Sequence, residues 1–345
     1  MSNLNFAYLG TSELSVKILD KLIENGYVPS LVVTAPDKTK GRKMIMTPPP
    51  IKVFAQSHNL KIIQPESLAV KPPLGGLTAK SFDLFIVASY GKIIPKSILD
   101  IPKFGTLNVH LSLLPKFRGP SPIQSFILSG EEKTGATIML MDEQVDHGQI
   151  LSQKEFGNKI SNLKSKNLNA KELEEKLAEL GGQMLVDVIP KWISGEIKAK
   201  EQNHSQATFT KKISKEDGLV DLEKNSPELI YRKFLAFQPW PGIYYFAQKN
   251  NQKTRVIITD MEMSESGQLK IKKVKPESKN PSHNHRYGNV GKWSIKNQKN
   301  ETGRKKRDGV RKVYEVIVVY PRSNLSAARK RNRDKYFLQI QFQTF

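Results

Sequence analysis

The 345-residue chain contains no cysteine, which excludes disulfides, thiolate metal ligands and a cysteine nucleophile. It also has no apolar run near the roughly 20 residues that cross a bilayer, because the longest candidates, such as 314–320, are only strand-sized. Residues 1–5 show neither the positive start nor the long apolar run of a signal peptide. These absences predict a cytoplasmic protein whose catalysis, if any, uses other groups.

Acidic residues are scarce, with 33 Asp and Glu against 55 Lys and Arg, for a net charge of +22. Residues 281–345 hold sixteen Lys and Arg against four Asp and Glu, so they carry +12 of that excess. Such a charge attracts polyanions, most commonly nucleic acid, but a solvated, solubilising surface explains it equally well. Charge alone leaves both interpretations open.

Two nucleotide-binding motifs are incomplete. The turn at 10–13 lacks the second and third glycines of the dinucleotide fingerprint, which disfavours a nicotinamide or flavin cofactor. Gly291 and Lys292 lack the upstream glycine of a P-loop, which disfavours a kinase or NTPase.

Strand-like and helix-like patterns alternate over the first 200 residues, beginning with an apolar run and an amphipathic segment. This alternation predicts an α/β fold with a doubly wound, mostly parallel sheet in a first domain over 1–196, followed by a linker at 197–206. Strands are expected at 6–9, 31–33, 60–63, 84–88, 106–109 and 137–141, and helices at 13–24 and 172–192.

A smaller second domain is expected over 207–281. It combines a helix at 227–237 with short strands at 243–246, 255–260 and 269–274, a pattern typical of a small β-barrel-like module. Residues 282–345 form a basic tail of unpredicted fold, in which clusters at 304–307 and 329–331 leave disorder and an RNA-binding arm both open. Strand-like runs at 313–320 and 336–342 oppose uniform disorder.

Asn108 and His110 come at the end of an apolar strand, where open α/β sheets bind ligands. In an extended chain they share a face, so an amide and an imidazole together could stabilise negative charge on a carbonyl oxygen. Asp146, in a loop after a later strand, could support the imidazole and accept a proton. Taken singly, each of these three residues also has an ordinary structural explanation, because turn-capping Asn, structural His and loop Asp are all common.

The segment 112–124 favours the catalytic interpretation, because it resembles the signature of the folate-dependent formyltransferases. Its sequence is Ser-Leu-Leu-Pro-Lys-Phe-Arg-Gly-Pro-Ser-Pro-Ile-Gln. The resemblance extends over roughly the first four-fifths of the chain. The other matching segments are 9–11, 33–37, 41–42, 48–53, 64–68, 87–91, 134–139, 207–209, 215–217, 237–242 and 274–277.

The resemblance implies transfer of the formyl group of 10-formyltetrahydrofolate to the amino group of methionine on initiator tRNA, in translation initiation. It implies no metal, a catalytic domain over 1–196 and an OB-like β-barrel over 207–281 that contacts the tRNA stem through backbone charge. We expect a monomer. Asn108 and His110 would hold the oxygen of a tetrahedral intermediate, and Asp146 would support His110 and proton transfer. The implied folate-binding residues are Ser112, Leu113, Leu114 and Pro115, with Ser89, Tyr90 and Gly91 beside the pterin.

The segment 38–46 is similar to an insertion that enters the acceptor end of tRNA in this family. Its cations Lys38, Lys40, Arg42 and Lys43 could contact phosphates, while the apolar residues 44–46 could wedge against an unpaired end. A solvated turn explains the segment alone equally well.

Two positions depart from the family pattern: His147 and Gln149 stand where Thr and Asp are usual, and His147 is most simply a tolerated surface substitution.

Two alternative functions remain. One is a formyltransferase acting on an amino sugar nucleotide, which residues 122–124 and the basic insertion disfavour. The other is a non-catalytic tRNA- or RNA-binding protein on the same scaffold, which the intact Asn108, His110 and Asp146 oppose.

Overall fold

The computed structural model describes residues 4–41, 44–68, 82–156, 168–249, 252–264, 267–276 and 316–317. The chain divides into two compact units, Met1–Ile213 and Ser214–Phe345. The division falls seven residues after the expected start of the second domain. The domain boundaries drawn from the sequence, including the linker, stay predictions.

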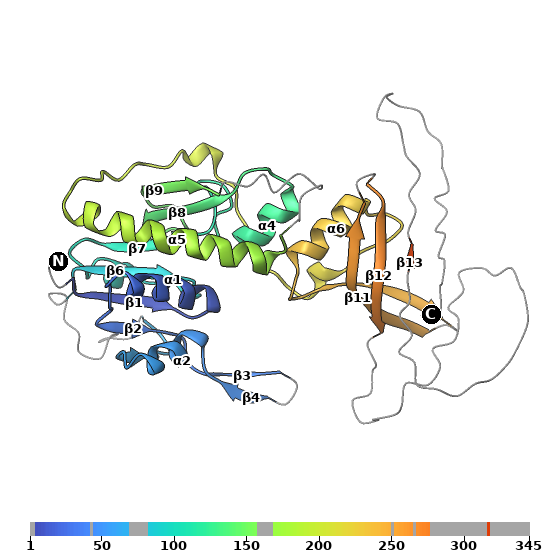
Figure 1. Cartoon of the computed structure of the whole chain (residues 1–345), viewed down its shortest axis with the longest axis horizontal. Helices are drawn as coiled ribbons and strands as arrows, with labels where there is room; N and C mark the ends of the chain where they lie inside the picture. Colours follow the sequence, from blue (N-terminus) through green and yellow to red (C-terminus); the bar gives the residue numbers. More distant parts are fainter. Residues whose placement is uncertain are drawn as a thin grey trace, which may run out of the picture. The chain divides into compact units, whose positions relative to one another are not determined.

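A seven-stranded sheet forms the centre of the first unit, in the order β5-β2-β1-β6-β7-β8-β9 (Figure 1). Neighbours from β5 to β7 are parallel, whereas β7 with β8 and β8 with β9 are antiparallel. The mostly parallel sheet is therefore confirmed. The strands are β1 (Phe6–Gly10), β2 (Leu31–Val33), β5 (Ile62–Ile63), β6 (Leu84–Ala88), β7 (Thr106–His110), β8 (Gly135–Leu140) and β9 (Ile150–Glu155).

The strand order reverses between β1 and β6. The chain first builds outward from β1 through β2 to β5, then returns to place β6 and β7 on the other side of β1. Gly10 and Ala88, the last residues of β1 and β6, are register partners. Such a reversal opens a crevice at the carboxyl ends of parallel strands, where open α/β sheets bind ligands.

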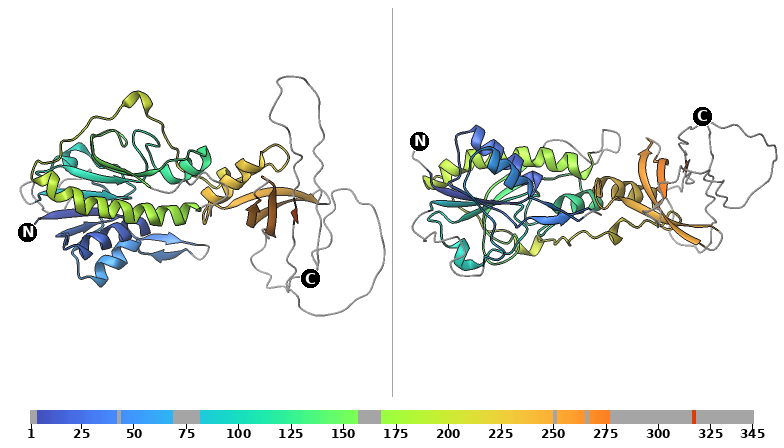
Figure 2. Two further views of the ribbon diagram at one scale, coloured as in Figure 1. Left: turned by 45° about the horizontal axis from the view of Figure 1, so that its top comes forward. Right: turned by 90° about the horizontal axis from the view of Figure 1, so that it is seen from below.

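One face of the sheet is covered by α1 (Glu13–Glu24) and α5 (Ala170–Ile193), which lie side by side in both views of Figure 2. Two glycines of α5 permit this packing. A Cβ at Gly181 would collide with Val109 of β7, and one at Gly182 would press on Lys21 of α1. The side chain of Val109 therefore points toward α5, while α2 (Pro50–Ser57) and α4 (Pro122–Ser129) border this helix layer.

The opposite face carries an apolar cluster and the short helix α3 (Lys96–Leu99). Because side chains alternate along a strand, Asn108 and His110 point away from Val109 and α5. Val87, the register partner of Asn108, belongs to this cluster. The buried members are Ala7, Leu9, Leu31, Val33, Leu68, Phe82, Phe85, Val87, Tyr90, Ile94, Ile98 and Leu99.

A hairpin made of β3 (Lys38–Lys40) and β4 (Ile45–Thr47) stands outside the main sheet. Its base is fixed by Asp37, whose carboxylate accepts hydrogen bonds from Lys52 of α2 at 2.8 Å and from Gln64 at 2.7 Å. These hydrogen bonds lower the pKa of Asp37, with Gln64 contributing most and Lys52 next.

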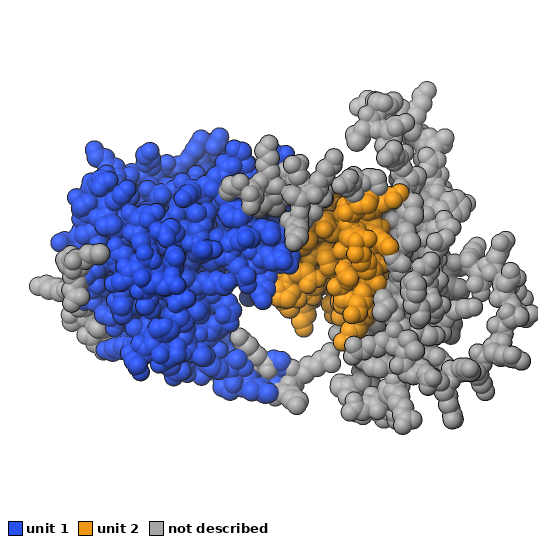
Figure 3. Space-filling view, in the orientation of Figure 1, with its two compact units in different colours: residues 1–213 blue, residues 214–345 orange. Residues whose placement is uncertain are grey.

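The second unit, orange in Figure 3, joins α6 (Pro227–Ala236) to an antiparallel sheet. The sheet has the order β10 (Ile243–Lys249), β11 (Gln252–Met263), β12 (Leu269–Pro276) and β13 (Val316–Ile317). A small C-terminal β domain is thus confirmed. Within the described residues the sheet is open, so its closure into an OB-like barrel stays a prediction. Most of the basic tail, including the run at 336–342, lies outside the described residues.

No helix in the described part of the chain is long and apolar enough to span a membrane.

Candidate active site

β7 carries two polar side chains, Asn108 and His110, in its last three residues. Asn108 and His110 are only 8% and 6% exposed. Both project from the sheet face opposite α5, as the strand alternation predicts. Buried polar groups are costly unless they are hydrogen-bonded, so the partners of these two side chains define the site.

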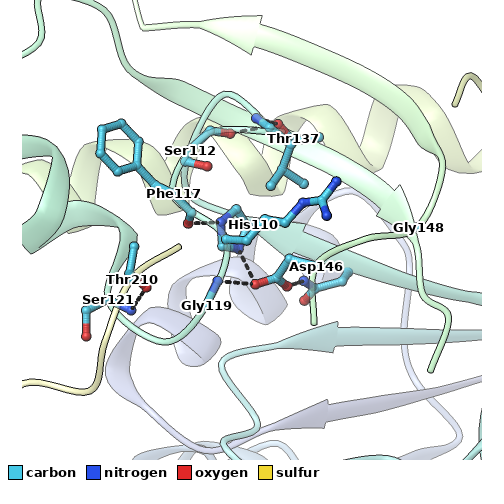
Figure 4. A network of polar contacts seen from close by, with 12 residues as sticks. His110, Ser112, Phe117, Gly119, Ser121, Thr137, Asp146, Gly148 and Thr210 are labelled. Carbon is cyan, nitrogen blue, oxygen red and sulfur yellow. Dashed lines mark hydrogen bonds and ion pairs between the residues drawn. The ribbon is translucent and has the colours of Figure 1, made fainter. Parts of the chain in front are cut away.

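Asp146 supplies the shared partner. Its Oδ1 accepts from Asn108 Nδ2 at 3.4 Å, and its Oδ2 lies 3.6 Å from His110 Nδ1. Oδ2 also accepts from the backbone N–H of Gly119 at 2.7 Å. Figure 4 shows this carboxylate between the His110 ring and Gly119. The structure therefore brings together all three residues predicted to be catalytic.

The His110 ring is oriented from both ends. Its Nε2 lies 3.0 Å from the carbonyl oxygen of Phe117, and a carbonyl oxygen can only accept, so Nε2 carries a proton. The other nitrogen, Nδ1, faces the Asp146 carboxylate. The ring thus lies between a main-chain acceptor and a carboxylate, which fixes its orientation.

The turn carrying Asp146 has an unusual backbone. Asp146 has φ +47°, in the left-handed region that few residues other than glycine adopt. Two residues later, a Cβ at Gly148 would collide with the carbonyl oxygen of Leu140. Glycine is therefore required where the turn passes close to the end of β8.

The loop after β7 is held by β8 and β9. Thr137 of β8 donates from its hydroxyl to Ser112 O at 2.7 Å, and Gln153 of β9 donates to Leu114 O at 2.8 Å. Ser112 is fully buried, and its own hydroxyl donates to Lys116 O at 2.7 Å. Of the four residues predicted to bind folate here, Ser112 and Leu114 are thus buried within the loop, whereas Leu113 and Pro115 are partly exposed.

The other predicted folate residues lie where the strand order reverses. Thr11 donates to Tyr90 O at 2.8 Å, and Ser12 donates to the Ser89 hydroxyl at 2.9 Å, linking the ends of β1 and β6. Ser89 and Gly91 are exposed and have positive φ. Burial raises the pKa of Tyr90 to about 12.

These residues end at the same edge of the sheet as the catalytic candidates. Val87 of β6 pairs with Asn108 of β7, so Ser89 and His110 each follow two residues farther along parallel neighbours. Parallel strands that end together present their following residues to one region.

The predicted tRNA contacts lie on the β3–β4 hairpin, which extends beyond α2 in Figure 1. Lys38 is exposed, as are Met44, Ile45 and Met46, whose exposed fractions are 60% or more. Arg42, Lys43 and the side chain of Lys40 lie outside the described residues.

Several structural partners of the site were not predicted. The main chain of Phe117 and Gly119 touches His110 and Asp146, and a strand-like segment at 208–210 pairs with this loop. Phe117 N donates to the Thr208 hydroxyl at 2.8 Å, and Ser121 N donates to the Thr210 hydroxyl at 3.1 Å. Main-chain contacts leave no mark on residue type, so only the unusual loop sequence could have pointed to them.

A carboxylate, an imidazole and an amide in one network can stabilise an oxyanion and move a proton. No group of three or more His, Asp or Glu side chains suited to a metal ion occurs among the described residues.

Comparison with known proteins identifies the family. Residues 4–189 match the model described as formyl transferase, and residues 212–292 match the formyl transferase C-terminal domain. The methionyl-tRNA formyltransferase of Bacillus velezensis is 40% identical over 246 residues, 71% of this chain and 75% of that protein. The protein of the same name from Chloroflexus aurantiacus is 40% identical over 240 residues, 69% of this chain and 75% of its own length.

A solved structure shares the fold. It is the N-formyltransferase of Helicobacter canadensis in complex with folinic acid and dTDP-3-aminofucose, with a TM-score of 0.53 and 18% identity, covering 78% of this chain and 95% of that one. The network of Asn108, His110 and Asp146 thus lies in a chain that matches both formyl transferase domains and resembles curated members over most of its length. The chain belongs to the formyl transferase family.

Proposed function

We propose that this enzyme transfers the formyl group of 10-formyltetrahydrofolate to the amino group of methionine esterified to initiator tRNA. The observation that carries the proposal is the convergence of Asn108, His110 and Asp146 in one polar network at the end of β7, in which the first two are buried. The identity of the acceptor rests on relatives about 40% identical that are named methionyl-tRNA formyltransferase.

In this reaction the lone pair of the neutral amine forms a bond to the formyl carbon, and the carbonyl electrons move onto the formyl oxygen. The Asn108 amide and His110 stabilise that oxygen as negative charge develops. Asp146 accepts the proton lost by the attacking nitrogen. When the carbon–nitrogen bond to the folate breaks, the carbonyl re-forms and the folate nitrogen takes up a proton, leaving tetrahydrofolate and the formylated amine.

The folate would bind along the edge formed by the ends of β1, β6 and β7. Leu113 and Pro115 are partly exposed in the loop after β7, and Ser89 and Gly91 are exposed after β6. Tyr90, between those two exposed residues in the sequence, is buried. We assign Ser112 and Leu114 to the support of this folate site because both are buried.

The acceptor end of tRNA would meet the β3–β4 hairpin. Its exposed apolar residues Met44, Ile45 and Met46 suit contact with unstacked bases. The cations of this insertion, Lys38, Lys40, Arg42 and Lys43, together with the net charge of +22, suit phosphates.

The test is a formyl-transfer assay with 10-formyltetrahydrofolate and methionyl initiator tRNA, run in parallel with an amino sugar nucleotide as acceptor. His110→Ala is expected to lower kcat by roughly 10²- to 10⁴-fold, because it removes both an oxyanion contact and the partner of Asp146. The matched control is His58→Ala, at an exposed histidine that ends α2 and should leave kcat unchanged.

Two results would count against the proposal. Transfer to the sugar nucleotide but not to the tRNA would assign a different acceptor. An undiminished rate in His110→Ala would remove His110 from the catalytic machinery.

A further inference from the structure

Residues 200–210, which the sequence suggested as mostly linker, are built into the active site. Lys200 forms an antiparallel bridge with Ile150 at the start of β9, and Phe209 forms a parallel bridge with Arg118. Between these two attachments lies Gln202, which is only 4% exposed. A buried glutamine in a connecting segment requires partners for its amide.

Both ends of the Gln202 amide are used. Its Nε2 donates to the carbonyl oxygens of Asp146 at 3.0 Å and Gly148 at 2.7 Å. Its Oε1 accepts from Arg118 Nε at 3.2 Å and Nη2 at 2.7 Å. Glutamine suits this position because glutamate has no amide donors and asparagine is one methylene shorter.

The two carbonyl groups that Gln202 binds flank the strained turn of the site. Asp146 has φ +47°, a conformation that persists in a non-glycine residue only when its surroundings fix it. The amide of Gln202 joins the two ends of this turn from outside, while Gly119 N–H and His110 meet the Asp146 carboxylate from inside. The direction of the carboxylate therefore depends on the turn that Gln202 holds.

Arg118 and His204 in turn fix Gln202. Arg118 is 3% exposed, and its Nη2 also lies 2.8 Å from His204 Nδ1. Because a guanidinium only donates, Nδ1 must accept, and His204 Nε2 then donates to Glu201 Oε1 at 2.9 Å. The His204 ring stacks on His147, the residue after Asp146, with centroids 4.0 Å apart. Gln202 and His204 thus contact three consecutive residues of the turn, 146–148.

We propose that Gln202 is a positioning residue for catalysis, which holds the Asp146 turn so that its carboxylate meets His110, with Arg118 and His204 fixing the Gln202 amide. This role rests on the proposed function for its effect on rate. Since Gln202 binds main-chain atoms behind Asp146, its loss should slow the chemical step while leaving the substrate contacts in place.

The test uses the full-length protein with Gln202→Glu, which keeps the size of the side chain and an acceptor for Arg118 but replaces the donors to Asp146 O and Gly148 O. The expected result is a kcat lower by roughly 10- to 100-fold with both KM values within about twofold of wild type. The melting temperature should stay within a few degrees. The matched control is Gln144→Glu, an exposed glutamine of the same loop, which should behave as wild type.

A second variant and a second readout protect the test against a folding defect. Gln202→Asn keeps an amide too short to reach both Arg118 and the turn, and should show the same loss of kcat. The ring ¹⁵N resonances of His110, measured without substrates, should shift in both Gln202 variants and not in Gln144→Glu.

These readouts separate the positioning role from the reaction itself. Wild-type protein that fails to formylate methionyl-tRNA would contradict the proposed function, while the His110 resonances would still decide the role of Gln202. A wild-type kcat, or unchanged His110 resonances, in either folded variant would overturn the positioning role.

Discussion

At the scale of single residues, His147 shows how a departure from the family pattern acquires a structural meaning. From the sequence it was most simply a tolerated surface substitution. In the structure its Nδ1 lies 2.6 Å from Asp142 Oδ2, and its ring stacks parallel to that of His204. The side chain is only 24% exposed. His147 therefore joins the loop of Asp146 to the segment that carries Gln202.

His147→Thr introduces the residue that is usual in the family. We expect this change to lower the free energy of unfolding by about 0.5–1.5 kcal/mol, because the ring stack and the contact with Asp142 are lost. Turnover should stay within about threefold, since Gln202 still holds the main chain of Asp146. Urea denaturation followed by fluorescence measures the first effect, with His58→Thr as the control. Equal stability of wild type and His147→Thr would show that the stack contributes nothing.

Residue type and spacing predicted part of the site. Asn108 and His110 alternate along one strand, so their shared face followed from local geometry. Their meeting with Asp146, 36 residues after His110, depends on how β8 packs beside β7, which no local pattern encodes. The sequence offered Asp146 as one candidate partner among many loop aspartates, and the resemblance selected it. Gln202 was missed because a lone glutamine in a polar segment carries no signal.

At the scale of elements, strongly patterned segments were predicted best. The helix expected at 13–24 is α1 with the same bounds, because its apolar positions recur at helical spacing. β9 was not predicted, since Ile150–Glu155 is a mostly exposed edge strand of polar composition. The β3–β4 hairpin was missed as structure because two three-residue strands are too short to show a period.

The base of that hairpin offers an acid-sensitive contact. Hydrogen bonds from Gln64 and then Lys52 lower the pKa of Asp37. The stability that these bonds give the folded protein is therefore complete above the unfolded-state pKa of about 3.9, and it is lost as the pH falls through the lower folded-state pKa. Asp37→Asn should therefore melt below wild type at pH 7, and the difference should shrink toward pH 3. Thermal melting at both pH values measures this, and a constant difference would contradict it.

At the scale of the whole molecule, charge is divided unevenly between the enzyme and its C-terminal extension. Residues 281–345 carry +12 of the net +22, although most of them lie outside the described residues. The second of the two formyl transferase matches ends at residue 292, so much of this charge comes after the family domains. An RNA-binding role for the tail is therefore a prediction separate from catalysis.

Replacing Arg304, Lys305, Lys306 and Arg307 by serine should weaken tRNA binding at low salt and flatten the dependence of log K on log salt by up to about three units, as fewer counterions are released. The kcat at saturating tRNA should not change. Filter binding across a salt series measures the tRNA affinity of each protein and its salt dependence. The control is a variant with Ser294, Asn297, Gln298 and Asn300 changed to alanine, which keeps the charge. Identical salt slopes would leave the tail without a role in tRNA binding.

The contact between Gln202 and Asp146 also limits where this protein can recombine with its relatives. A chimera joined within residues 197–201 would combine Asp146 and Arg118 of one parent with the glutamine, histidine and threonines of the other. Such a hybrid could keep both domains folded and still carry a mismatched catalytic turn. Junctions placed after Ile213, where the first compact unit ends, would take Asp146, Arg118 and Gln202 from one parent. The segment up to Ile213 should therefore be exchanged together with the loop of Asp146.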